Sequence, residues 1–131
     1  MSNRYPRIKF TGLVPVPGDP NDRRIMLNLV WDGKTYSTIF EPATSVEADL
    51  RAVADATIEC LKKITTEAAF KVLDIQAMRL LSHEAVAVSI ATHHEEGTEF
   101  AVGLCVNKVG RGDAAARAVL NGTNRLMERL L

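Results

Sequence analysis

The chain has 131 residues, and its 16 lysines and arginines balance its 16 aspartates and glutamates, so the formal net charge is zero. Hydrophobic residues make up 47% of the sequence, which suits one soluble globular domain over residues 1–131 and excludes a disordered or collagen-like chain. Balanced charge argues against a nucleic-acid partner, because phosphate binding needs a local excess of Lys and Arg.

The first half is predicted to contain three strands and a helix. The strand-like runs are residues 7–16, 24–31 and 34–41. Asp32-Gly33 between the last two runs predicts a hairpin, because both residues tolerate positive φ. Apolar residues spaced by three, four and seven predict a helix from Val46 to Ile64. Thr44, with Glu47 three residues later, is expected to cap this helix.

The second half repeats this order. Its predicted strands are residues 70–81, 85–93 and 98–107, with turns at 82–84 and 95–97. A second helix is expected to begin at its N-cap, Asp113, and to continue to the end of the sequence. Gly122 in its middle costs about 1 kcal/mol relative to alanine, which indicates that something packs closely against that turn.

The two halves align with a constant shift of about 66 residues. The helices align Leu50 with Ala116, Val53 with Val119, Leu61 with Met127 and Ile64 with Leu130. The third strands align Tyr36, Thr38 and Phe40 with Val102, Leu104 and Val106. Such self-similarity indicates a duplicated supersecondary unit. The predicted fold class is therefore α+β, with βββα repeats at about 7–66 and 70–131 that form antiparallel sheets with two helices.

The last two predicted strands alternate between large and small side chains. The large side consists of Val86, Val88, Ile90, Phe100, Val102, Leu104 and Val106. The small side consists of Ala85, Ala87, Ser89, Ala91, Ala101, Gly103 and Cys105. We expect the large side to lie under the helices. The small side is nearly free of charge, so we expect it to be covered by the rest of the chain, by a second subunit or by a ligand.

The cysteines and the N-terminal sequence predict a cytoplasmic protein. Cys60 and Cys105 lie far apart in apolar segments, which is typical of buried thiols rather than of a disulfide framework. The first residues have no apolar run behind their charge, so we expect no signal peptide. No apolar run approaches the roughly 18 residues that a membrane span needs, and no membrane contact is expected.

Residues 84–131 resemble the C-terminal regulatory domain that α-isopropylmalate synthases share with citramalate synthases. The similarity rests on the strand Ala85-Val86-Ala87-Val88, on Phe100-Ala101-Val102-Gly103-Leu104, and on the helix 114–120, which leads to Asn124-Arg125. In that family the domain consists of two strand-strand-strand-helix units, binds leucine or isoleucine for feedback inhibition and helps the enzyme to dimerise. We do not expect the synthase reaction on this chain, because 131 residues leave no room for the family's catalytic barrel.

The small side and the resemblance together give a ligand-binding hypothesis. The residues expected to line the site are Pro42, Ala43, Thr44, Ala101, Gly103 and Cys105. We expect a non-catalytic, regulatory-like domain that forms a homodimer and binds a small metabolite, such as an amino acid, without a cofactor. The alternative is a protein-interaction or dimerisation module that has no small-molecule ligand.

Three other patterns favour structural roles. His93 and His94 are adjacent on a strand and point to opposite faces, so His93-His94-Glu95-Glu96 indicates a solvated hairpin tip rather than a metal site. The segment 110–113 indicates a tight turn and helix cap rather than an anion site. No nucleophile motif occurs, so we expect no catalytic residue, and a small enzyme built on His83, His93 and His94 ranks below both alternatives.

Overall fold

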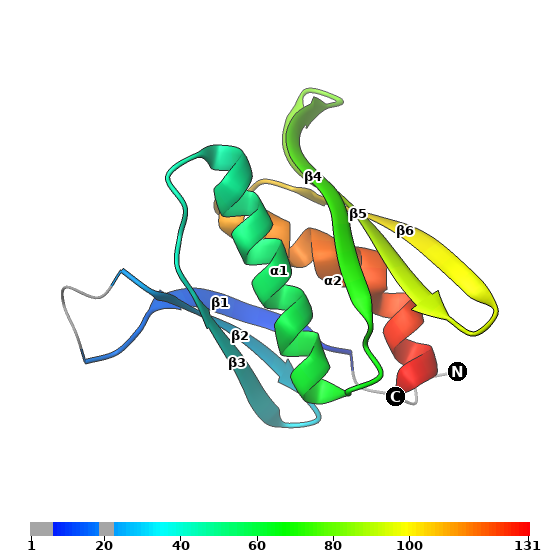
Figure 1. Ribbon diagram of the computed structural model, residues 1–131. Coiled ribbons are helices and arrows are strands. Elements are labelled where there is room, and N and C mark those ends of the chain that lie inside the picture. Colours follow the sequence, from blue (N-terminus) through cyan, green and yellow to red (C-terminus); the bar gives the residue numbers. More distant parts are fainter. Residues whose placement is uncertain (1–6, 19–22) are drawn as a thin grey trace.

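The computed structural model describes residues 7–18 and 23–131, and in this part of the chain the order βββα occurs twice (Figure 1). The first unit contains β1 (Lys9–Pro15), β2 (Ile25–Trp31), β3 (Lys34–Phe40) and α1 (Val46–Ile64). The second unit contains β4 (Phe70–Leu80), β5 (His83–His94), β6 (Gly97–Val106) and α2 (Arg111–Leu130). The predicted α+β fold with duplicated βββα units is therefore confirmed.

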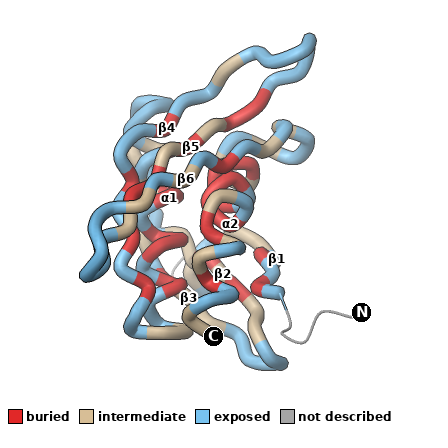
Figure 2. The backbone as a smooth tube through the Cα atoms, turned by 90° about the vertical axis from the view of Figure 1, so that its right-hand side faces the viewer, coloured by how far each residue is buried: buried red, intermediate tan, exposed pale blue. Residues whose placement is uncertain are grey.

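Each unit forms its own antiparallel sheet, in the order β1-β2-β3 and β4-β5-β6. The two helices lie between the sheets, as Figures 1 and 2 show. Helix α1 contacts β2 and β3 of its own sheet and β4 of the other, whereas α2 contacts β5 and β6 and also β1. The core lies in this middle layer. Its largest fully buried side chains include Leu27, Leu29, Leu50, Leu61, Val88 and Val119.

Short turns connect β2 to β3, β4 to β5 and β5 to β6, and they set the register of these pairs. Asp32 and Gly33 have φ values of 52° and 74°, which confirms the predicted hairpin. Leu81 and Ser82 adopt the same left-handed conformation, at 48° and 68°, between the paired residues Leu80 and His83. The turn expected at 82–84 therefore begins one residue earlier. The next turn consists of residues 95–96, because β6 already begins at Gly97.

Both helix caps differ from the predictions. Ser45 rather than Thr44 caps α1, and its Oγ accepts a hydrogen bond of 3.2 Å from the N–H of Ala48. Helix α2 begins at Arg111, with no side-chain hydrogen bond at its N-cap position. Asp113, the expected cap, lies inside the first turn, where its charge suits the helix dipole. Its carboxylate accepts a hydrogen bond of 2.9 Å from the Nε of Arg117, one turn further along.

A buried threonine in each helix confirms the 66-residue alignment of the helices. Thr57 and Thr123 are both fully buried. Each hydroxyl donates a hydrogen bond of 2.8 Å to the carbonyl oxygen four residues earlier, on Val53 and Val119 respectively. The same residue type, burial and bond therefore recur at equivalent positions.

Two arginines that are also 66 residues apart connect the units. Arg51 of α1 donates a hydrogen bond of 2.7 Å to the carbonyl oxygen of Val72, where a bulge interrupts β4. The guanidinium of Arg117 in α2 lies 5.3 Å from the ring centroid of Phe10, beside the corresponding bulge in β1. Each helix therefore contacts the first strand of the opposite unit through an equivalent residue.

The 66-residue shift is wrong for the third strands. Thr38 of β3 is buried and faces α1, but Leu104, its predicted equivalent in β6, is exposed. The β6 residues that face α2 include the buried Gly103. The third strands are therefore displaced by one residue relative to the helices, and such a displacement turns every side chain to the other face.

The prediction that the large sides of the last two strands share one face, and their small sides the other, is consequently wrong. Val88 lies opposite Gly103, so the large side of β5 shares a face with the small side of β6. This mixed face lies against the helices. A Cβ on Gly103 would lie 1.8 Å from the carbonyl oxygen of Ala118, and one on Gly122 would lie 3.0 Å from the nitrogen of Gly103. The close neighbour expected at Gly122 is confirmed, and it is Gly103.

Candidate functional site

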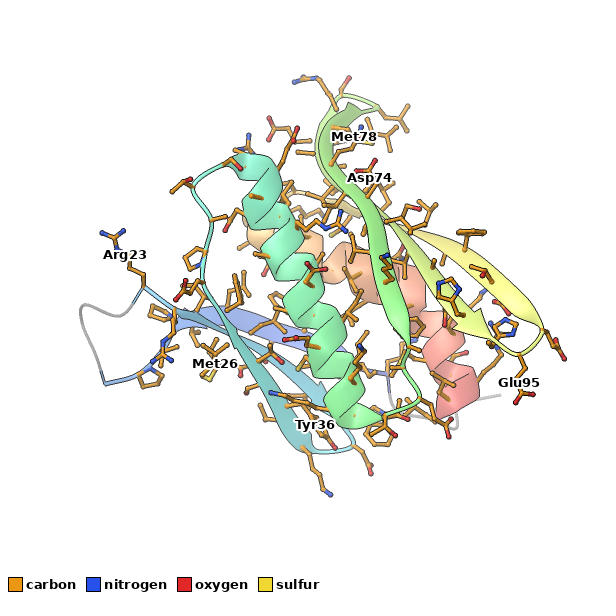
Figure 3. All side chains as sticks on the ribbon, in the orientation of Figure 1. Arg23, Met26, Tyr36, Asp74, Met78 and Glu95 are labelled. Atoms are coloured by element: carbon orange, nitrogen blue, oxygen red, sulfur yellow. The ribbon has the colours of Figure 1, made fainter. Side chains whose placement is uncertain are left out.

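The first candidate site is the outer face of the second sheet, which is turned away from the helices. Strand pairing places the following side chains on it: Lys71, Asp74, Gln76 and Met78 of β4; Ala85, Ala87, Ser89 and Ala91 of β5; Phe100, Val102, Leu104 and Val106 of β6. Figure 2 shows β6 as mostly exposed, and Figure 3 labels Asp74 and Met78 along β4. Phe100 and Val102 are 70% and 71% exposed, which is unusual for large apolar side chains.

This outer face is also hollowed. A shallow cavity of about 240 Å³ lies over its middle, and Ala87 and Ser89 are in its wall. Met78 borders the cavity on the β4 side and Val102 on the β6 side. Because alanine and serine are short, the middle strand forms a groove between the longer side chains of the two outer strands. The face therefore combines projecting apolar groups with a depression of side-chain size.

The six residues predicted to bind a ligand lie in two places. Pro42, Ala43 and Thr44 lie in the loop before α1, where the N–H of Ala43 donates a hydrogen bond of 3.1 Å to Oδ1 of Asp49. Ala101, Gly103 and Cys105 lie on the side of β6 that faces α2. Contact with the α2 backbone fills the space at Gly103. None of the six lines the cavity over Ala87, the one described next, or those beside Arg51 and Arg111.

Neither cysteine is activated for chemistry. Burial is the main cause that raises the pKa of the Cys60 thiol, and the same holds for Cys105. A raised pKa lowers the fraction of reactive thiolate at neutral pH. The two thiols are therefore suited to packing, and both are free rather than paired in a disulfide.

The second candidate site is a cavity of about 280 Å³ at the end of the second unit. Its wall combines the apolar side chains of Phe70, Leu126 and Leu130 with polar residues from three segments. The polar residues are Glu67, Thr92, His93, His94, Glu96, Glu99 and Arg129. The volume lies near the lower end of the range for ligand pockets, which suits a small molecule.

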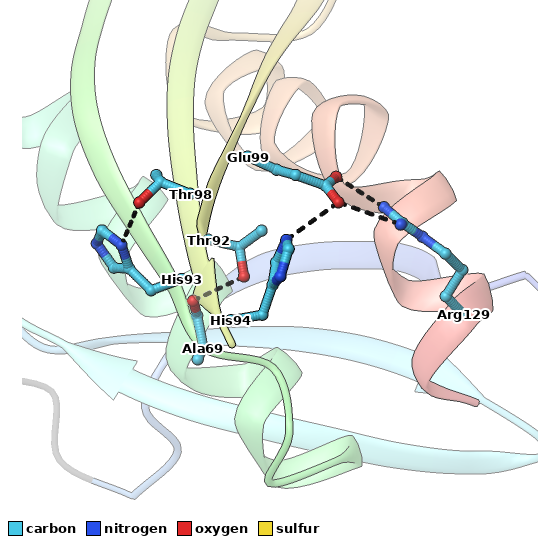
Figure 4. A network of polar contacts seen from close by, with 7 residues as sticks. All are labelled: Ala69, Thr92, His93, His94, Thr98, Glu99 and Arg129. Carbon is cyan, nitrogen blue, oxygen red and sulfur yellow. Dashed lines mark hydrogen bonds and ion pairs between the residues drawn. The ribbon is translucent and has the colours of Figure 1, made fainter. Parts of the chain in front are cut away.

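A network of polar contacts runs beside this cavity (Figure 4). Arg129 of α2 binds the carboxylate of Glu99 through both terminal nitrogens, at 2.8 and 3.2 Å. His94 Nε2 lies 3.2 Å from the same carboxylate, and His93 Nδ1 lies 2.8 Å from the hydroxyl of Thr98. The hydrogen bonds from Arg129 are the main cause that lowers the pKa of Glu99. Glu99 therefore stays ionised and joins the β5–β6 hairpin to the last turn of α2.

The histidines do not form one catalytic or metal-binding group. His83 begins β5, whereas His93 and His94 end it, so roughly 30 Å of extended strand separates them. His93 and His94 have different partners, as expected for neighbours on one strand. Across residues 7–18 and 23–131, no three His, Cys, Asp or Glu side chains are arranged to hold a metal ion.

No family model matches the chain, and no curated protein is significantly similar to it. Within the described residues, no helix has both the length and the apolar character that a membrane crossing requires.

Sequence reasoning missed the two sites for different reasons. The apolar alternation of Phe100 and Val102 was visible, but it did not show which way those side chains face. The pairing of Arg129 with Glu99 joins residues 30 positions apart, and no pattern in the sequence connects them. Gly103 was expected to line the ligand site, but the space beside it is taken by close contact with α2 of the same unit.

Proposed function

We propose that this chain is a non-catalytic, regulatory-like domain of the cytoplasm that forms a homodimer through the outer face of its second sheet. The exposure of Phe100 and Val102 on an otherwise weakly polar sheet face carries this proposal. A monomer rarely leaves such a face in water, since burying it gains about 25 cal/mol per Å². The predicted dimer, and the dimerising role that the resemblance to isopropylmalate synthase regulatory domains implies, agree with it.

The shape of the face favours a second copy of the chain as the occupant. A twofold interface brings the same patch together twice, so that patch must complement itself. Here the projecting Phe100 and the hollow over Ala87 and Ser89 lie on one face, so each copy offers both a knob and a groove. The charged groups on the face, Lys71 and Asp74, have opposite signs, so a second copy adds no net repulsion.

The size of the face sets the expected affinity. Three strands of 10 to 12 residues span a rectangle of about 35 by 14 Å, or about 500 Å² when taken as flat. Standard interfaces bury about 800 Å² per partner, so this dimer lies at the small end of stable interfaces. We therefore expect a dissociation constant in the micromolar range rather than an obligate dimer.

The test is the mass of the protein in solution. Sedimentation equilibrium over a micromolar concentration range should show a reversible monomer–dimer equilibrium. The double variant Phe100→Ser/Val102→Ser should raise the dissociation constant at least tenfold, because it removes the apolar knobs and leaves the core untouched. A tenfold change corresponds to about 1.4 kcal/mol of association free energy.

The first sheet supplies the matched control. Val14 and Ile39 are its exposed large apolar residues, so Val14→Ser/Ile39→Ser removes similar side chains from the opposite side of the molecule. This variant should dimerise like the unaltered protein. A monomer throughout the concentration range, or equal weakening by both double variants, would contradict the proposed interface. Far-ultraviolet circular dichroism confirms that each variant is folded before the masses are compared.

The ligand is the second part of the proposal, and the cavity beside His94 supports it. Its 280 Å³ and its mixture of apolar and charged groups suit a small metabolite such as an amino acid. The sequence instead predicts ligand contacts at Pro42–Thr44 and at Ala101, Gly103 and Cys105, and these stay predictions. The alternative is an interaction module without a ligand, and a dimer that shows no thermal shift with any amino acid or branched 2-oxo acid would favour it.

A further inference from the structure

The charges in the cavity beside His94 are unbalanced, and the imbalance selects the kind of ligand. Three carboxylates, those of Glu67, Glu96 and Glu99, line it together with one guanidinium, that of Arg129. The pair between Arg129 and Glu99 is bidentate, so the charge of the guanidinium is balanced by that of Glu99. Glu67 and Glu96 then remain, and the described residues give neither carboxylate a hydrogen bond or ion pair. The free charge of the cavity is therefore negative.

The apolar part of the wall selects the rest of the ligand. Phe70 is 6% exposed and forms part of the cavity wall, and the side chains of Leu126 and Leu130 on α2 are half-buried beside it. These groups come from β4 and α2, whereas Glu67 and Glu96 come from the loop before β4 and from the β5–β6 turn. A ligand can thus place a hydrocarbon body against Phe70 and a charged group between the two loops.

We infer that this cavity binds a small organic amine, with its ammonium group at Glu67 and Glu96 and its apolar body against Phe70, Leu126 and Leu130. An ammonium offers three donors and a full positive charge, which matches two unpaired carboxylates. A ligand whose only charged group is a carboxylate or phosphate would meet the two free negative charges and a guanidinium that is already bound to Glu99, whereas the ammonium of an amino acid can bind there. The inference deepens the ligand part of the proposed function and does not depend on the dimer.

The experiment compares three probes that share one carbon skeleton. Isoamylamine, isoamyl alcohol and isovalerate carry a positive, a neutral and a negative group on the same branched body. Each is titrated into the ¹⁵N-labelled full chain while amide chemical shifts are recorded. We expect isoamylamine to shift the amides of residues 92–99 and 126–130 and to bind at least tenfold more tightly than either other probe.

Variants in the two loops test the role of the carboxylates. Glu67→Gln/Glu96→Gln keeps the size of the side chains and removes both charges, so it should weaken isoamylamine binding at least tenfold. Glu95→Gln is the control that removes one neighbouring charge, because Glu95 adjoins Glu96 at the tip of the β5–β6 hairpin (Figure 3) but is not among the residues that line the cavity. It should change binding less than twofold. All of these side chains are at the surface, so the fold should be retained.

Several results would overturn the inference. Isovalerate that binds as tightly as isoamylamine would show that the cavity does not select a cation. Shifts confined to other parts of the chain, or no shifts at millimolar amine, would show that the cavity is not the site. Equal weakening by Glu95→Gln would reduce the effect to general surface charge. None of these results changes the sedimentation behaviour that tests the dimer, so the two proposals can fail separately.

Discussion

The outer faces of the two sheets differ although the sheets share one topology. On the first sheet, Asn28 lies opposite Ser37 at the centre of the face, and the Ser37 hydroxyl donates a hydrogen bond to the Asn28 side chain. The corresponding centre of the second sheet holds Ser89 and the exposed Val102. The first face therefore pairs polar side chains at its centre, and its exposed large apolar residues, Val14 and Ile39, lie to one side of that pair at 38% and 48% exposure. The second face has no such polar pair at its centre and exposes Phe100 and Val102 to 70% and 71%, so within one duplicated fold it is the surface better suited to a partner.

The contacts beneath the sheets differ as well. In the second unit, Gly103 lets α2 approach the backbone of β6, whereas the first unit has Thr38 on the helix-facing side of β3. In β6 the large side chains lie on the outer face and the small ones face α2. The apolar outer face and the close helix contact therefore occur together in the second unit. The following predictions test this comparison in order of decreasing expected effect.

Gly103→Ala should give the largest loss of stability. Its Cβ would lie 1.8 Å from the carbonyl oxygen of Ala118, so α2 or β6 must move. Overpacking of this kind costs about 3 kcal/mol, measured as the free energy of unfolding in urea. Gly110→Ala is the control, since nothing lies within 4 Å of the added methyl group, and it should cost under about 1 kcal/mol. A tolerated Gly103→Ala would refute the claim of close approach.

Thr57→Ala and Thr123→Ala should destabilise the protein equally. Each removes a buried hydroxyl and a buried methyl group together with the 2.8 Å hydrogen bond, so each should cost about 1–2 kcal/mol. Urea denaturation of the two variants at one protein concentration measures both values. A difference above about 1 kcal/mol would show that the equivalence of the helices does not extend to their energetics.

Substitutions in the two left-handed turns, Asp32-Gly33 and Leu81-Ser82, should change the stability of the protein in opposite directions. Leu81→Asn/Ser82→Gly places suitable residues at φ values of 48° and 68° and should stabilise the protein by about 1 kcal/mol. Asp32→Leu/Gly33→Ser makes the reverse change in the first unit and should destabilise it by a similar amount. Thermal unfolding, followed by circular dichroism, compares the two. No gain from the first double variant would mean that the strain at Leu81 is offset elsewhere.

Acid should weaken the second unit through Glu99. Arg129 and His94 lower the pKa of Glu99 in the folded state below its ordinary value of 4.5. A lowered pKa stabilises the fold above the unfolded-state pKa, and this contribution is lost as the pH falls through the folded-state pKa. Between pH 5 and strongly acidic pH, the Glu99→Gln variant should therefore lose less stability than the unaltered protein. The difference should be small, as is typical of an exposed ion pair. Denaturation curves across this pH range provide the measurement, and an unchanged pH profile would contradict the role of Glu99.

Local sequence patterns predicted most of the fold correctly. Apolar spacing placed α1 at its observed bounds, and Asp32-Gly33 placed the first hairpin, because both signals depend on neighbouring residues. These local signals could not predict which side of β6 faces the helices. Alternation divides a strand into two sides, but pairing between strands decides which side faces the helices. Gly122 and Gly103 held the information on how β6 faces α2, because each glycine leaves room for the backbone at the other.

The candidate sites were harder to predict than the fold. The proposed amine site combines Glu67, Glu96 and Leu126, which come from two loops and the C-terminal part of α2. Their proximity depends on how the second sheet and α2 meet, and no periodicity encodes that. The predicted ligand residues around Pro42 and Gly103 were chosen from local character alone, and the structure places them in separate regions of the molecule.

The two arginines that connect the units, Arg51 and Arg117, bear on how the molecule could be divided. Arg51 reaches β4 of the second unit, and Arg117 reaches β1 of the first, so each half contributes to the other's helix packing. A cut between α1 and β4 would therefore give two fragments of similar size, each with one side of its helix uncovered. Mixed together, such fragments should associate and rebuild the central helix layer. The duplicated chain is, in this sense, a pair of complementary halves that one short connection keeps at high effective concentration.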